Sequence, residues 1–247
     1  MLIDSHAHLG DCRVFDLEVT EDQLLATLDR YRVDAAIVQP FPGAVSAPAV
    51  HDRIARLARD HPGHIYGLAS ISPHLSRREY TAEIERCVRD LGFVGIKLHT
   101  IGHAVAPGSK DAQTVYEVAL DLNVPVMAHT GTGVPFALPS LFLPIARSHP
   151  QLRLVLAHAG FGIYTPEAAM VARECSNIFL ETSWCTPQAI GLLIRTLEPG
   201  RVMFGSDLPI NLGVELAKVE AIAPDPARRE AFLATAAAAA FRLPGAP

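Results

Sequence analysis

The chain has 247 residues and a formal charge of −5 at pH 7, and 49% of its residues are hydrophobic. Its lysines and arginines are scattered, which argues against a nucleic-acid-binding surface, and no apolar run reaches the roughly 18 residues that cross a membrane. The first residues do not resemble a secretory signal, and the four cysteines form no CxxC pair. We therefore expect a cytoplasmic protein whose partner is a small-molecule substrate, without nucleic acid or membrane as a partner.

Eight short runs rich in valine, isoleucine and leucine predict strands that are buried on both faces. They span residues 2–3, 35–38, 66–71, 94–98, 125–128, 153–157, 178–180 and 202–204. Amphipathic segments between the runs predict crossover helices, and a last helix closes the chain. These helices are expected at residues 21–31, 50–61, 77–91, 111–122, 138–148, 166–175, 187–197 and 226–241.

Eight strands that alternate with helices, with no linker-like segment between them, predict one α/β domain over residues 1–247 with the (β/α)8 TIM-barrel fold. An open doubly wound sheet is the competing architecture, but no GxGxxG motif follows the first strand. In a (β/α)8 barrel the active site lies at the carboxyl ends of the strands.

Residues with metal-binding chemistry stand where several of these runs end, namely His6, His8, Lys97, His99, His129, His158 and Asp207. His6 and His8 are two positions apart, so both side chains share a strand face and can chelate one ion. Taken singly, each histidine could be a hydrogen-bonded strand end, and Asp207 could be a helix cap or an Asx turn. Together they indicate a metal site, because buried imidazoles and carboxylates are costly unless they are paired or metal-bound.

Lys97 shares a strand face with His99, and a protonated lysine beside a divalent cation would be strongly repelled. Three alternatives stay open. The lysine could be neutral through desolvation, could turn away to bind an anionic substrate, or could react with carbon dioxide to form a carbamate. A carbamate offers two oxygens and a negative charge, and it could bridge two metals.

Five short motifs, in this order, are spread over essentially the whole chain: Asp4-Ser5-His6-Ala7-His8, Gly95-Ile96-Lys97-Leu98-His99, Ala128-His129-Thr130-Gly131, Ala157-His158-Ala159-Gly160 and Phe204-Gly205-Ser206-Asp207-Leu208-Pro209. Together they resemble the amidohydrolase superfamily, and more narrowly its amidohydrolase-related (amidohydrolase 2) branch of metal-dependent TIM-barrel hydrolases. The stretch Lys97-Leu98-His99 is similar to the lysine region of dihydroorotase and urease, where the lysine is carbamylated.

The resemblance implies a divalent metal cofactor, with zinc as the expected ion. His6 and His8 would hold the more buried ion with Asp207, and Asp207 would also accept the proton of the attacking water. His129 and His158 would hold or face a second position. A carbamylated Lys97 would imply two ions, whereas many members of this branch hold one. His99 would position the substrate carbonyl, and a homodimer would fit the branch.

The leading interpretation is a metal-dependent hydrolase that acts on an amide, cyclic amide or lactone carbonyl through metal-activated water, with Asp207 as general base. The first alternative is nonoxidative decarboxylation of a small unsaturated or aromatic acid at one metal, as in aminocarboxymuconate-semialdehyde decarboxylase and its relatives. The second alternative is a non-catalytic metal-binding barrel.

Loop residues that follow strands could also line the site, although packing in an exposed loop is their more common fate; they are His103, Thr130, Thr132, Ser183 and Trp184. Arg13 and Lys110 are candidates to grip a substrate carboxylate. A further set of histidines in or beside helices is interpreted as surface or capping residues: His51, His61, His64, His74 and His149.

Overall fold

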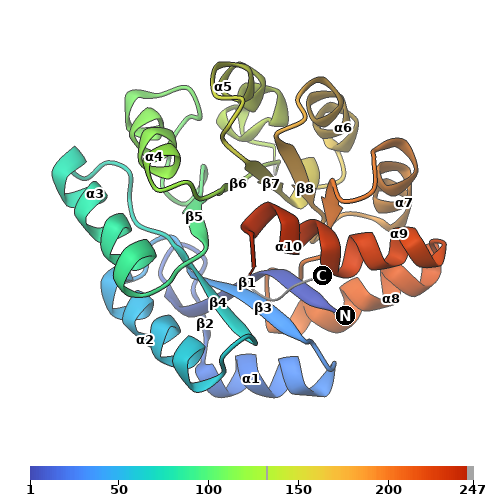
Figure 1. Ribbon diagram of the computed structural model, residues 1–247, viewed down its shortest axis with the longest axis horizontal. Helices are drawn as coiled ribbons and strands as arrows, with labels where there is room; N and C mark the ends of the chain where they lie inside the picture. The colour runs from blue at the N-terminus through green and yellow to red at the C-terminus, as the bar shows by residue number, and fades with distance from the viewer. Residues whose placement is uncertain (132, 244–247) are drawn as a thin grey trace.

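The computed structural model describes residues 1–131 and 133–243, and a ring of parallel strands lies at its centre with helices around it (Figure 1). The parallel strands pair in chain order. They are β1 (Ile3–Cys12), β3 (Ala35–Pro40), β4 (Ile65–Ala69), β5 (Gly95–Leu98), β6 (Val126–His129), β7 (Leu154–Ala157), β8 (Ile178–Glu181) and β9 (Val202–Met203). All eight predicted strands are confirmed.

The ring closes between β1 and the segment that follows β9. Ser5 N–H donates to the Phe204 carbonyl at 3.2 Å, and Asp207 N–H donates to the His6 carbonyl at 2.7 Å. The fold is therefore the expected (β/α)8 TIM barrel. A short strand, β2 (Leu17–Val19), pairs antiparallel with the far end of β1 and was not predicted, because three residues are too few to show a period.

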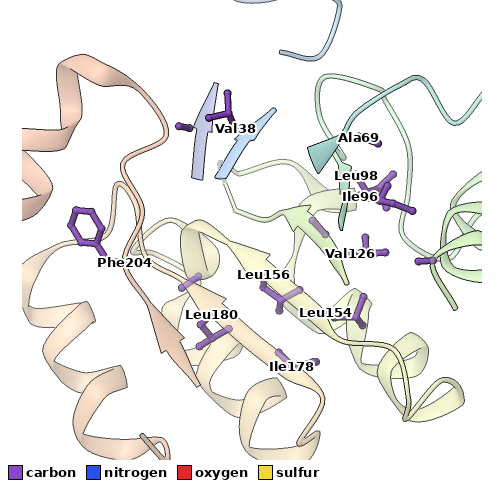
Figure 2. Close-up of a cluster of buried hydrophobic side chains, with 14 of the residues drawn as sticks. Val38, Ala69, Ile96, Leu98, Val126, Leu154, Leu156, Ile178, Leu180 and Phe204 are labelled. Carbon is purple, nitrogen blue, oxygen red and sulfur yellow. The ribbon is translucent and has the colours of Figure 1, made fainter. Parts of the chain in front are cut away.

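Alternate residues along each strand face opposite sides of the barrel wall. Leu154 and Leu156 of β7, with Ile178 and Leu180 of β8, belong to the large cluster between strands and helices (Figure 2). Val155 instead belongs to a smaller cluster inside the ring. The same alternation places Ile96 and Leu98 in the outer cluster, so Lys97 faces inward.

Most crossover helices follow the prediction within three residues: α1 (Glu21–Arg30), α2 (Ala47–Asp60), α3 (Arg77–Glu85) with the π-helical turn Arg86–Asp90, α4 (Lys110–Asp121), α6 (Thr165–Glu174) and α7 (Pro187–Thr196). The helix predicted at 138–148 is shorter, because a 3-10 turn (Pro139–Phe142) precedes α5 (Leu143–Ser148). Capping boxes at Thr20 and Ser76 fix where α1 and α3 begin. Within the described residues no helix is long and apolar enough to span a bilayer.

One helix, α8 (Pro209–Ile222), was missed by the sequence analysis. Its apolar residues do not form one stripe, and Ile210 and Val214 are exposed, so the helical period is weak. The predicted closing helix is in fact α9 (Pro226–Glu230), a π-helical segment (Ala231–Thr235) and α10 (Ala236–Phe241).

The carboxyl-terminal helix α10 closes the amino-terminal end of the barrel. In Figure 1 it crosses in front of the ring, close to the amino terminus. Its alanines and Phe241 pack against inward-facing residues that include Ile3, Ile37 and Met127. Only the opposite end of the barrel, where the strands end, is left for a site.

His51 is buried, so its interpretation as a surface or capping residue was wrong. Its Nδ1 lies 2.7 Å from Oε1 of Glu83, and its Nε2 accepts the N–H of Ser70 at 3.0 Å. Arg86 donates to both Glu83 oxygens. Burial opposes ionisation of Glu83, but the hydrogen bonds from His51 and Arg86 lower its pKa to about 2.

We expect Glu83→Gln to lower the free energy of unfolding by about 2 kcal/mol at pH 7, measured by urea denaturation. Because folding depresses this pKa, the stabilisation is complete above the unfolded value near 4.5 and is lost as the pH falls towards about 2. The difference between variant and parent should therefore shrink below pH 4.5. Glu85→Gln, which removes an exposed pair with Arg89, should cost less than about 0.5 kcal/mol; equal losses would contradict the prediction.

Candidate active site

All seven residues predicted from the strand ends lie at the carboxyl end of the barrel. His6 and His8 are on β1, Lys97 is on β5 with His99 directly after it, and His129 ends β6. His158 and Asp207 follow β7 and β9. A pocket of about 280 Å³ is lined by His8, His99, His129, His158 and Asp207, together with Phe15, Leu17, Phe41, Phe161, Trp184 and Leu208.

Hydrogen bonds orient the rings of His6 and His8 so that the two Nε2 atoms face each other. His6 Nδ1 lies 2.7 Å from Oε2 of Glu181, and His8 Nδ1 lies 3.2 Å from the Pro40 carbonyl. Both partners are acceptors, so both Nδ1 atoms carry the proton. The two Nε2 atoms, 3.2 Å apart, therefore both present lone pairs.

Asp207 adds a third electron-pair donor to the same point. Its Oδ1 is 3.1 Å from His6 Nε2 and 3.3 Å from His8 Nε2. Two ligand atoms at about 2.1 Å from a tetrahedral zinc ion lie roughly 3.4 Å apart. Three acceptors at this spacing repel one another unless a cation lies among them, so the donor set fits a divalent metal.

Lys97 supplies positive charge to this cluster. Its ammonium Nζ is 2.9 Å from His6 Nε2, and the side chain is buried. Burial lowers the pKa of Lys97 to about 8, although Asp207 and Glu181 oppose the shift. The lysine is thus placed beside the nitrogen that a metal would use, and burial makes its ammonium easier to deprotonate than that of an exposed lysine.

His129 and His158 lie next to this cluster. The His158 ring is 5.1 Å from the His6 ring and 4.6 Å from the His129 ring, centre to centre. His158 Nδ1 bonds Ser183 Oγ at 2.8 Å, and that hydroxyl donates to Glu181 at 3.0 Å, so His158 Nε2 keeps its lone pair. Both nitrogens of His129 are buried without a partner among the described residues, which is costly and fits a ligand role.

His99 lines the pocket as a hydrogen-bond donor. Its Nδ1 accepts the N–H of Gly102 at 3.0 Å, so the proton is on Nε2. Its ring stacks on that of His129 at 4.4 Å between centres. Burial lowers the pKa of His99 well below its ordinary value, so the ring is a neutral donor at pH 7.

Burial also lowers the pKa of His6 and of His129 well below the ordinary range, and that of His158 to about 4. For Asp207, burial acts to raise the pKa, but the neighbouring His6, His8 and His158 lower it well below its usual value. Neutral imidazoles beside an ionised carboxylate are the protonation states that bind metals.

Glu181 is a site residue that the sequence analysis missed. Its Oε2 accepts from His6 Nδ1 and from the backbone N–H of His158 at 3.2 Å, and its Oε1 accepts the N–H of Ser183 at 2.5 Å. A carboxylate that orients a metal-binding histidine fixes its tautomer. The signal was present, because Glu181 follows the predicted strand at 178–180 as the other site residues follow theirs.

Asp4, the first residue of the motif Asp4-Ser5-His6-Ala7-His8, has a structural role that the sequence did not indicate. It is buried and accepts from the backbone N–H of His6 at 3.2 Å, and from the Ser206 N–H and hydroxyl at 2.9 and 2.5 Å. Burial raises the pKa of Asp4 to about 7, against the hydrogen bonds from Ser206 and His6. It ties the segment carrying His6 to the one carrying Asp207.

Trp184, expected only as a loop residue that could line the site, lines the pocket and contacts Asp207 directly. Its indole Nε1–H donates to Oδ2 of Asp207 at 2.8 Å. Positive φ angles, unusual for side chains other than glycine, occur at Trp184, Asp207 and His158, and such strain concentrates at functional sites. Arg13, Lys110 and His103 do not line the pocket, and Thr132 lies outside the described residues.

A second cluster of metal-ligating residue types, His51, Glu83 and Cys87, lies between α2 and α3. Burial raises the pKa of the Cys87 thiol, and Arg86 already bonds both Glu83 oxygens. A protonated thiol and a carboxylate held by a guanidinium are poor ligands. This cluster is therefore an ion-pair network of the fold.

A (β/α)8 barrel with this set of ligand atoms at the carboxyl ends of its strands is typical of metal-dependent α/β-barrel enzymes. The family model described as amidohydrolase matches residues 3–243, and the chain belongs to that metal-dependent family.

Relatives of the chain carry out different reactions. It is 24% identical to a 2-keto-4-carboxy-3-hexenedioate hydratase from Sphingobium, over 77% of this chain and 72% of the relative. A 5-carboxyvanillate decarboxylase from Novosphingobium aromaticivorans, solved with manganese and 4-hydroxy-3-methoxy-5-nitrobenzoic acid, superposes with TM-score 0.79 at 15% identity, covering 98% of this chain and 96% of that one. A probable 2-pyrone-4,6-dicarboxylic acid hydrolase from Acinetobacter baumannii superposes with TM-score 0.68 at 16% identity, covering 98% and 99%. Membership therefore leaves the reaction to be argued from the site.

Proposed function

We propose that this protein is a metal-dependent hydrolase of an amide, cyclic amide or lactone, and that residues 1–247 form its catalytic domain. The observation that carries the proposal is the convergence of His6 Nε2, His8 Nε2 and Asp207 Oδ1, all within 3.3 Å of one another. These atoms would hold the more buried ion, with zinc as the expected metal because imidazole and carboxylate suit it.

When bound, such an ion supplies Lewis acidity, which polarises a carbonyl and eases the deprotonation of water. Asp207 accepts the proton of the attacking water; the oxygen of that water bonds to the carbonyl carbon while the acyl–nitrogen or acyl–oxygen bond breaks. Asp207 then returns the proton to the leaving group. Trp184 Nε1–H holds the second carboxylate oxygen in place, and His99 Nε2–H donates to the substrate carbonyl.

Lys97 is proposed to be carbamylated, and the carbamate would then help to hold two metal ions. Burial lowers the pKa of Lys97 to about 8, which gives it a larger fraction of the neutral amine that reacts with carbon dioxide than an exposed lysine has. His129, with both nitrogens unpartnered among the described residues, and His158, with a free Nε2, would hold the second ion. The negative carbamate also removes the repulsion between an ammonium and the metals.

Metal analysis of protein grown with zinc and bicarbonate tests this assignment. We expect about two zinc ions per chain, as in two-metal hydrolases, falling to about one or fewer in Lys97→Ala. Protein prepared with carbon-13 bicarbonate should show a carbamate NMR signal that Lys97→Ala lacks. Lys110→Ala, at an exposed lysine outside the pocket, is the matched control and should keep both the metal and the signal.

About one metal, unchanged by Lys97→Ala, would refute the bridged centre and favour the second candidate, nonoxidative decarboxylation of a small unsaturated or aromatic acid at one ion. The observation that favours this candidate is that His6, His8 and Asp207 already form a one-metal set without the lysine. Release of carbon dioxide from such acids without an oxidant would identify it.

A further inference from the structure

The wall of the reaction pocket is apolar and largely aromatic. Outside its histidines and Asp207, every described lining residue is apolar or aromatic: Phe15, Leu17, Phe41, Phe161, Trp184 and Leu208. Phe15 and Trp184 are 46% and 38% exposed, so their rings are open to a ligand that enters the mouth. Burial of such surface favours a ligand with an apolar body.

Two of these aromatic residues are held in place at a conformational cost. Phe161 and Trp184 both have positive φ, at 56° and 66°, where non-glycine residues are strained. Their rings are nearly parallel, with 17° between planes and 6.4 Å between centres. The Phe41 ring stacks on the His8 ring with 4.4 Å between centres, so the aromatic surface of the wall reaches the cluster of histidines and Asp207.

No arginine or lysine is among the described residues that line this pocket. Lys97 lies beneath the lining and is bonded to His6. Arg13 and Lys110, the candidates to grip a carboxylate, are both exposed outside it. A carboxylate buried against this wall would lose its hydration without gaining an ionic partner, which is strongly unfavourable.

We propose that the substrate of this site is a flat, unsaturated or aromatic molecule that carries at most one carboxylate. Its reacting group lies at the histidines and Asp207, and its uncharged body lies against Phe15, Phe161 and Trp184. This inference rests on the proposed function for the location of the reacting group. It separates this chain from a relative whose substrate is named as a dicarboxylic acid.

Trp184 is the single tryptophan of the chain, so its fluorescence reports occupation of the pocket directly. The zinc-loaded protein is titrated with four probes that share one ring and differ in charge: benzamide, benzoate, isophthalate and trimesate. We expect benzamide and benzoate to bind at least about tenfold more tightly than isophthalate and trimesate. Equal or reversed affinities, or no response to benzamide and benzoate, would overturn the proposal.

Two variants test the wall itself. Phe161→Ala should weaken benzoate binding about fivefold or more, whereas Ile163→Ala, an exposed residue outside the lining, should leave it unchanged. Phe15→Arg should tighten isophthalate binding about tenfold by supplying the missing cation. Met170→Arg, on the outer face of α6, controls for added charge. If Phe15→Arg and Met170→Arg had the same effect, the wall would not set the preference.

Failure of this inference can be told apart from failure of the proposed function. Binding of the probes is measured by fluorescence and needs no turnover, so the charge preference can hold in a protein that hydrolyses nothing. Conversely, hydrolysis of an amide or lactone that carries two carboxylates, with tighter binding of isophthalate than benzoate, would keep the proposed function and refute the substrate class.

Discussion

Asp207→Asn is expected to lower kcat by about 10²- to 10⁴-fold, the range for loss of a positioned general base. Asparagine keeps an oxygen that can lie beside His6 and His8 at the position of Oδ1, but its amide cannot accept a proton from water. The amide nitrogen would also face the indole N–H of Trp184, which now donates to Oδ2. The measurement is steady-state kinetics together with zinc content.

Zinc content separates the two roles of this carboxylate. A large fall in kcat with unchanged metal would support proton transfer, and a parallel loss of metal would indicate that Asp207 acts mainly as a ligand. Asp16→Asn is the matched control, because Asp16 is exposed and has a positive φ that asparagine tolerates. Full activity in Asp207→Asn would remove the general base from the mechanism.

The barrel could be predicted because its pattern is repeated. Eight doubly buried strands give eight apolar runs, and each confirmed strand begins within one residue of its predicted start, although β1 continues to Cys12, well beyond the predicted run at 2–3. Elements outside this pattern were missed for physical reasons. The short strand β2 is held by its hairpin with β1, and α8 leaves Ile210 and Val214 exposed, so neither has a clear period.

The gathering of the site residues followed from the same pattern, because parallel strands end at one rim. The orientation of the side chains within the site could not be predicted from the sequence. The roles of Glu181 and Trp184 depend on which atoms they reach, namely His6 Nδ1 and Asp207 Oδ2. Likewise the burial of His51 depends on α2 packing against β4 and bonding Ser70 and Glu83, contacts between segments far apart in the chain.

Glu181→Gln is expected to weaken zinc binding by 10- to 100-fold, the usual effect of losing the partner of a metal-binding histidine. The carboxylate now accepts on both oxygens, from His6 and the His158 N–H on Oε2 and from the Ser183 N–H on Oε1. An amide has one oxygen, so its NH₂ must face a donor on one side. His6 then loses the acceptor that keeps its proton on Nδ1 and its lone pair on Nε2.

Competition with a chromophoric chelator measures the zinc affinity, and urea denaturation of the metal-free protein measures stability. Glu83→Gln is the matched control: it removes a carboxylate bonded to a buried histidine, His51, outside the pocket lining, and should destabilise the fold while leaving zinc affinity unchanged. If Glu181→Gln lowered stability alone, Glu181 would be a structural residue like Glu83. A loss of zinc affinity beyond the loss of stability would instead show that Glu181 sets the tautomer of His6, because only that state presents a lone pair to the metal.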